Sequence, residues 1–184
     1  TYATTLTAGV SEIYRDDINL RYSIPYLRTW SEDVDPYDPN SSTDMLDQFR
    51  NHWSSQMGNV SRTITHMLTG RTNLPYGGVA YVSVLCNQSY GYGVSGYLEG
   101  TFPYPLQDNN GGNWDLVVMS HELGHNNGTL HTHDGYNPPI DNCGNGDCTG
   151  AQGATIMSYC HTCPGGIANI QLGFNPLVQD VMLG

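Results

Sequence analysis

The sequence contains no lysine, and its six basic residues are all arginines. They lie between Arg15 and Arg71, so residues 72–184 carry neither Lys nor Arg, and the formal net charge of the chain is −11. Nucleic-acid binding depends on basic side chains that neutralise phosphates. We therefore expect no nucleic-acid partner, and the negative field favours neutral or cationic peptides over acidic polymers.

Long hydrophobic runs are also missing. No run approaches the roughly 20 apolar residues of a membrane-spanning helix, so we expect no membrane span. The sequence does not open with a charged stretch followed by an apolar one, so no signal peptide is visible. A chain of 184 residues is long enough to form one domain with a hydrophobic core.

Residues 121–131 read H-E-x-x-H-x-x-G-x-x-H. His121 and His125 are four positions apart, so on a helix they share one face, about one turn apart. Six further helical residues would carry His131 roughly 240° away from His125, so the helix must end between them. Gly128 suits that end because it lacks a Cβ and adopts the left-handed conformation at little cost. Three imidazoles can then converge on one Zn²⁺ ion.

Glu122 lies beside the first of these histidines but off their shared face. It can therefore hold a water molecule without occupying the metal. Three histidine ligands leave a fourth position open, which is typical of a catalytic rather than a structural zinc site. The alternative is a helix with ordinary surface or core histidines, and the combined spacing of three histidines, an acid and a glycine argues against it.

These eleven residues resemble the zinc motif of the metzincin metalloendopeptidases. Metzincins also carry a methionine-containing turn beneath the zinc, and residues 154–159 resemble it, with Met157 standing 26 residues after His131. Residues 10–15 and 80–86 resemble the adamalysin (reprolysin) branch, especially its bacterial secreted members. The chain is identified on these residues as a reprolysin-like metzincin.

Two positions depart from that branch. Thr132 stands where the branch usually has Asp, directly after the third histidine, and Tyr159 stands two residues after the methionine, the spacing of astacins and serralysins. Matrixins, astacins and serralysins therefore remain alternatives within the superfamily.

The resemblance implies an α/β (α+β) fold. We expect a twisted, mainly parallel sheet with an antiparallel edge strand, a long zinc-binding helix, and an irregular C-terminal part ending in a helix. One catalytic domain would span residues 1–184, with an upper subdomain of residues 1–128 and a lower one of residues 129–184. The resemblance further implies a monomer that is secreted as a zymogen, with Thr1 beginning the processed chain.

The implied function is zinc-dependent hydrolysis of peptide bonds in proteins. Glu122 would be the general base, and Tyr159 would donate to the oxyanion or switch onto the zinc, as in astacins, with a packed core tyrosine as the equal alternative. The substrate would pair with an exposed edge strand, for which we choose Gly93, Val94, Ser95 and Gly96 over a simple glycine-rich hairpin.

A different class of function is a zinc-holding module that binds an extended peptide without cutting it. Such relatives usually lose the glutamate, which this chain keeps at Glu122. Hydrolysis of small molecules or carbohydrates is a third option with less support, because a glycine-rich edge suits extended peptides better.

The five cysteines predict disulfides in an exported enzyme, with one left over. Cys143 and Cys148 could close a small ring, and Cys86 could pair with Cys160 or Cys163, but the connectivity stays open. A second zinc site at Cys160, His161 and Cys163 is a weaker alternative. The other metal to consider is Ca²⁺ in the acidic loop that holds Asp33, Asp35 and Asp38, although a solvated loop fits the spacing better.

The hydrophobic pattern predicts helices over residues 2–15, from about Asp44 to Met57, from Trp114 through the zinc motif, and from Pro176 onward. Alternation predicts a strand over residues 18–24, and the apolar run 79–86 predicts a central strand.

Overall fold

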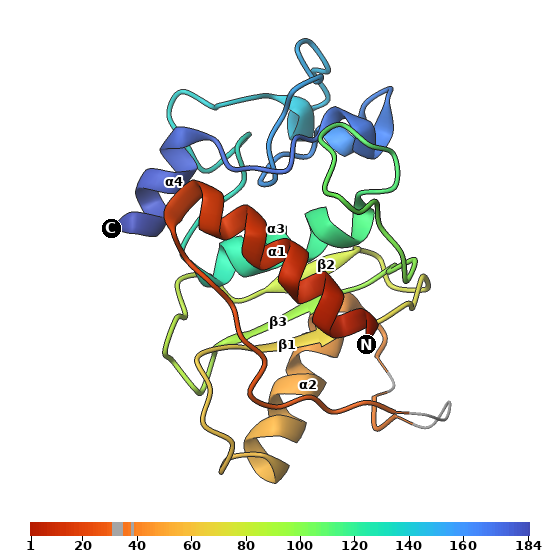
Figure 1. The fold of residues 1–184 in the computed structure, drawn as a ribbon, viewed down its shortest axis with the longest axis vertical. Helices are drawn as coiled ribbons and strands as arrows, with labels where there is room; N and C mark the ends of the chain where they lie inside the picture. Colours follow the sequence, from red (N-terminus) through yellow and green to blue (C-terminus); the bar gives the residue numbers. More distant parts are fainter. Residues whose placement is uncertain (31–34, 38) are drawn as a thin grey trace.

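The computed structural model describes residues 1–30, 35–37 and 39–184. It is a mixed α+β fold in layers (Figure 1). A small sheet lies between helix α2 (Ser42–Gln56) on one face and helices α3 (Trp114–Asn126) and α1 (Tyr2–Ile18) on the other. The C-terminal third of the chain lies beyond α3, on the side away from α2.

Helix α1 packs closely on α3. Its buried stripe includes Leu6, Val10 and Ile13, which share one core cluster with Leu116 of α3. A Cβ at Gly9 would come within 2.9 Å of Leu116 Cδ2, so the glycine permits the close approach of the two helices. The helix runs to Ile18 and is capped by Asn19, which has a left-handed φ of 55°. The strand predicted over residues 18–24 is therefore wrong: residue 18 is helical, and residues 19–24 form no strand.

The sheet contains three strands in the described residues: β1 (Thr65–Leu68), β2 (Gly78–Ala80) and β3 (Tyr92–Ser95), in the order β1-β3-β2. Strand β3 pairs in parallel with β1 and antiparallel with β2. The expected antiparallel edge strand is therefore present, but the sheet has one parallel and one antiparallel pairing rather than a mainly parallel pattern.

The position chosen for the substrate-binding edge is wrong. Gly93, Val94 and Ser95 belong to the central strand, which is paired on both sides, buried along its whole length, and covered by α2 on one face and α3 on the other. Gly96 donates its backbone N–H to Gly77 at 2.6 Å. The two edge strands are β1 and β2, and β2 is the antiparallel one.

The strand predicted over residues 79–86 is also corrected. Only Gly78–Ala80 is a strand, and it is an edge rather than the centre. The chain then turns, and the backbone N–H groups of Ser83 and Val84 donate to the carbonyls of His125 and Asn126 at 3.0 Å each. These two backbone N–H groups thus bind carbonyls at the C-terminal end of α3.

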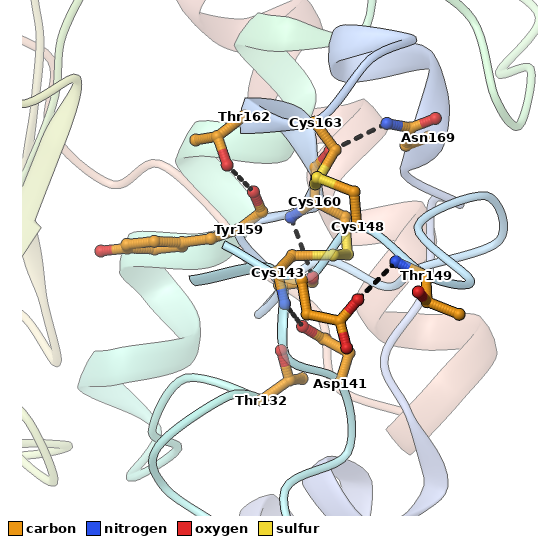
Figure 2. The surroundings of a disulfide bond; sticks show 12 residues. Thr132, Asp141, Cys143, Cys148, Thr149, Tyr159, Cys160, Thr162, Cys163 and Asn169 are labelled. Atoms are coloured by element: carbon orange, nitrogen blue, oxygen red, sulfur yellow. Dashed lines mark hydrogen bonds between the residues drawn. A yellow bond between two sulfur atoms is a disulfide. The ribbon is translucent and has the colours of Figure 1, made fainter. Parts of the chain in front are cut away.

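Residues 127–175 form turns and three short 3-10 helices among the described residues: η1 (Cys143–Asn145), η2 (Cys160–Thr162) and η3 (Gly166–Asn169). Two disulfides, Cys143–Cys160 and Cys148–Cys163, join the segment around η1 to the segment around η2 (Figure 2).

The proposed Cys143–Cys148 ring is therefore wrong, and so are the pairings proposed for Cys86, whose thiol is exposed and free in the described structure. The disulfides also exclude a second zinc site at Cys160 and Cys163.

Helix α4 (Pro176–Leu183) closes the chain as predicted. Asn175 accepts a hydrogen bond from the Leu177 N–H at 3.0 Å and caps the helix, and Pro176 occupies the first turn. No helix in the described part of the chain is long and apolar enough to cross a membrane.

The acidic loop considered for Ca²⁺ lies only partly within the described residues. Asp33 and Asp38 lie outside the described residues. Asp35 forms an ion pair with Arg71 at 3.1 Å, which gives this carboxylate a partner within the protein.

Candidate metal centre

Three histidine side chains meet at the end of α3. His121 and His125 come from the helix, and His131 from the turn that follows it; their ligand atoms lie within 4.8 Å of one another. Gly128 has a φ of 104°, which lets the chain reverse after the helix ends at Asn126. The sequence therefore folds locally as its spacing predicts, and these three residues could hold zinc.

Backbone carbonyls fix the tautomers of the two helical histidines. The Nδ1 of His121 is 2.8 Å from the Ile156 carbonyl, and the Nδ1 of His125 is 2.9 Å from the Thr129 carbonyl. A carbonyl can only accept a hydrogen bond, so each Nδ1 carries the proton and each Nε2 presents a lone pair. This second set of contacts orients the rings toward a shared centre.

The donor set fits a cation. The Nε2 atoms of His125 and His131 lie 3.0 Å apart, close to the roughly 3.3 Å between two nitrogens bound tetrahedrally to one zinc ion. Burial lowers the pKa of His121 well below its usual value, lowers that of His125, and lowers that of His131 to about 4. The imidazoles are therefore neutral at physiological pH, which is the form that binds a metal ion.

Glu122 is buried beside these rings, with an exposed fraction of 5%. Its Oε2 atom has no hydrogen-bond partner among the described residues, and burial raises its pKa to about 8. A buried carboxyl group without a partner is costly. Such a group beside nitrogens that could hold a metal ion is suited to take up and release a proton.

Met157 lies beneath the site and is fully buried. Its carbonyl accepts from the Thr132 N–H at 3.1 Å, which ties the residue after His131 to the methionine turn. A Cβ at Gly124 would lie 2.6 Å from the Met157 Sδ, so the sulfur packs directly on the helix between the two histidines. Thr132, which departs from the branch pattern, thus makes a structural contact.

Tyr159 lies against the third histidine. Its ring centroid is 4.5 Å from that of His131 and 5.9 Å from that of His121. Figure 2 shows the ring pointing away from the paired cysteines, and burial raises the pKa of its hydroxyl. The ring of His133 stacks on that of His131, with 5.3 Å between the centroids, and the ring centroid of His161 lies 5.7 Å from that of Tyr159. Both additional imidazoles therefore lie next to the site.

Two contributors were missed by sequence reasoning. Gly78 of β2 lies directly over Glu122, because a Cβ there would be 2.3 Å from the glutamate Oε1. Asn126 donates from Nδ2 to the carbonyls of Tyr81 and Tyr92, at 2.9 and 3.0 Å, and joins the end of α3 to the sheet. Asn126 lies within the zinc motif at one of its unspecified positions, so the motif gives no signal for it.

Comparison with known families agrees with this geometry. The model of a reprolysin branch, described as metallo-peptidase family M12, matches residues 1–171. The chain belongs to metallo-peptidase family M12 and is a reprolysin-like metzincin. A search of curated proteins gave no match.

Proposed function

We propose that this chain is a zinc-dependent endopeptidase that cuts peptide bonds within proteins. The observation that carries the proposal is the convergence of His121, His125 and His131 beside a buried, unpartnered Glu122 carboxyl group. Membership of a peptidase family supports protein or peptide substrates. Zinc held by these histidines would supply Lewis-acid chemistry, which polarises a carbonyl and acidifies water.

The protein's own groups account for the proton transfers. Glu122 accepts a proton from the attacking water as the new C–O bond forms, and it delivers that proton to the amine nitrogen as the C–N bond breaks. Burial raises the pKa of Glu122 to about 8, so this carboxyl group binds a proton readily.

Tyr159 is the candidate donor to the developing oxyanion. Its ring packs 4.5 Å from His131 and its hydroxyl keeps its proton, since burial raises its pKa. A preorganised donor of this kind stabilises the tetrahedral intermediate.

Substrate binding is proposed at the open edge of β2. The backbone of Gly96 donates to Gly77 and that of Tyr81 donates to Tyr92. Because bonded residues alternate along an antiparallel pair, Gly78 and Ala80 direct their backbone groups outward. An extended peptide can pair with such an edge whatever its sequence.

We further propose that the chain acts outside the cell as a single catalytic domain, monomeric and activated from a zymogen. Its two disulfides support an oxidising environment. In this proposal the helix α3 ends the upper subdomain, and residues 129–184 form the lower one.

The test is the activity of Glu122→Ala. This variant keeps the three histidines, so it should keep its zinc while kcat on casein falls by at least about 100-fold. Zinc content by elemental analysis and casein hydrolysis, each with and without a chelator, measure the two effects.

A variant with full zinc and parent activity would refute the role of Glu122. A parent protein that holds zinc and binds an extended peptide but cuts none would favour the non-proteolytic binding module.

A further inference from the structure

Gly78 begins the edge strand β2 directly over helix α3, and Gly77 immediately precedes it. A Cβ built on Gly78 would lie 2.3 Å from the Oε1 of Glu122, 2.7 Å from its Cδ and 2.8 Å from its Cγ. A Cβ on Gly77 would lie 2.5 Å from the Trp114 Cζ2. The backbone of the strand therefore rests on two side chains of α3 with no space between them.

These glycines are needed for space rather than for conformation. Neither has a positive φ, unlike Gly128 with its φ of 104°. The backbone of Gly78 does not require a glycine, and the three atoms nearest to an added Cβ all belong to the Glu122 side chain.

The clash involves the whole glutamate side chain. Because Cγ and Cδ as well as Oε1 lie within 3.0 Å, a small rotation of the carboxyl group would not relieve it. Glu122 is 5% exposed and packed on its other sides, so a methyl group at position 78 would push the carboxyl group out of its present place.

The same residue faces the proposed substrate. Gly78 directs its backbone N–H and C=O to the open edge of β2, as the neighbouring ladder bonds of Gly77 and Tyr81 indicate. The missing side chain thus brings the carboxyl group of Glu122 directly against the edge where a peptide backbone would lie.

We propose that Gly78 is a positioning residue for Glu122. Because Gly78 lacks a Cβ, the Glu122 carboxyl group can lie against the edge strand β2, where the substrate would bind. The proposal rests on the proposed function for its catalytic consequence, but the contact itself can be tested without activity.

The first test is a thermal-unfolding cycle on the purified 184-residue chain. Gly78→Ala should lower Tm by roughly 3–10 °C, as expected for overpacking in a protein of this size. In a Glu122→Ala background the same substitution should lower Tm by less than a third of that amount, because the clashing side chain is gone.

Two control variants define the specificity of this coupling. Gly77→Ala meets Trp114 instead, so its loss of Tm should persist when Glu122 is replaced. Gly111→Ala has nothing within 4 Å of the new methyl group and should leave both Tm and activity unchanged.

The second test is kinetic. Gly78→Ala should lower kcat on casein by about 100-fold while zinc content stays at the parent level, because the base is displaced and the ligands are not. Adding Glu122→Asp, which shortens the acid by one methylene, should raise kcat above that of Gly78→Ala alone.

Each outcome decides the proposal. Equal loss of Tm in the parent and Glu122→Ala backgrounds would overturn it, as would parent kcat in Gly78→Ala. If Gly78→Ala fails to fold, recovery of folding by Glu122→Ala supports the proposal and failure of both variants refutes it. If no variant or parent cuts casein, the Tm coupling still tests the contact and only the proposed function fails.

Discussion

The candidate metal centre is built from two regions that are held together in different ways. His121 and His125 stand on a regular helix packed between α1 and the sheet, with their spacing set by helix geometry. His131 and Met157 come from a region of turns and short 3-10 helices. Helix α3 positions its histidines by regular helix geometry. The C-terminal region instead depends on disulfides and individual hydrogen bonds.

The difference follows from the core each region can form. Residues of α3 are buried almost continuously, from Asp115 to Asn126. The C-terminal region contributes isolated buried side chains, such as Ile156, Ile170 and Val178, to the same cluster. We therefore expect the two regions to respond differently to the loss of single contacts.

The largest effect should come from breaking the disulfides of the C-terminal region. They join Cys143 to Cys160 and Cys148 to Cys163, with sequence separations of 17 and 15, and each should stabilise the protein by about 3 kcal/mol. Replacing all four cysteines by serine should lower the free energy of unfolding by about 6 kcal/mol. Chemical denaturation measures it, with Cys86→Ser as the control; a loss below 1 kcal/mol would show that the disulfides do not hold this region.

A smaller effect should come from the helical region, at the residue that joins α3 to the sheet. Asn126→Leu removes two hydrogen bonds and leaves the Tyr81 carbonyl without its side-chain donor, whereas the Tyr92 carbonyl still accepts from the Tyr81 N–H; the substitution should cost about 2–4 kcal/mol. Exposed Asn59→Ala should change stability by less than about 0.5 kcal/mol. Urea denaturation of both variants checks the prediction, and equal stability of the two would contradict it.

The smallest effect should come from replacing Met157, beneath the three histidines, by a residue of similar volume. Met157→Leu conserves volume in a fully buried position, so its cost should stay below about 1.5 kcal/mol. Met157→Ala leaves a cavity and should cost about 2–5 kcal/mol. If the two variants unfold at the same denaturant concentration, packing of the methionine on Gly124 does not support the site.

The same division explains how far the sequence could predict the structure. Helix α3 and the reversal at Gly128 follow from local rules, and α4 follows from the cap at Asn175 and the proline after it. A strand was predicted at Gly93–Gly96, but its central position in the sheet could not be, because Gly93 and Ser95 are buried only through the packing of distant elements on β3. No local pattern distinguishes such a central strand from an edge.

Other features depended on contacts between distant residues. The apolar run after Ala80 meets the end of α3 instead of continuing as a strand, and only the fold shows that its N–H groups find the carbonyls of His125 and Asn126. Likewise the partner of Cys143 is Cys160, since the turns that carry them are adjacent in space and not in sequence. The role of Gly78 depends on the same kind of contact.

The most direct measurement is the zinc content of purified, zinc-replete protein. The parent and a His161→Ala control should each hold about one zinc ion per chain, because His161 lies beside Tyr159 and not among the three converging nitrogens. His131→Ala should lose the ion, since the two helical histidines alone leave the inner shell incomplete. Zinc at the parent level in His131→Ala, with its fold intact by circular dichroism, would contradict the account.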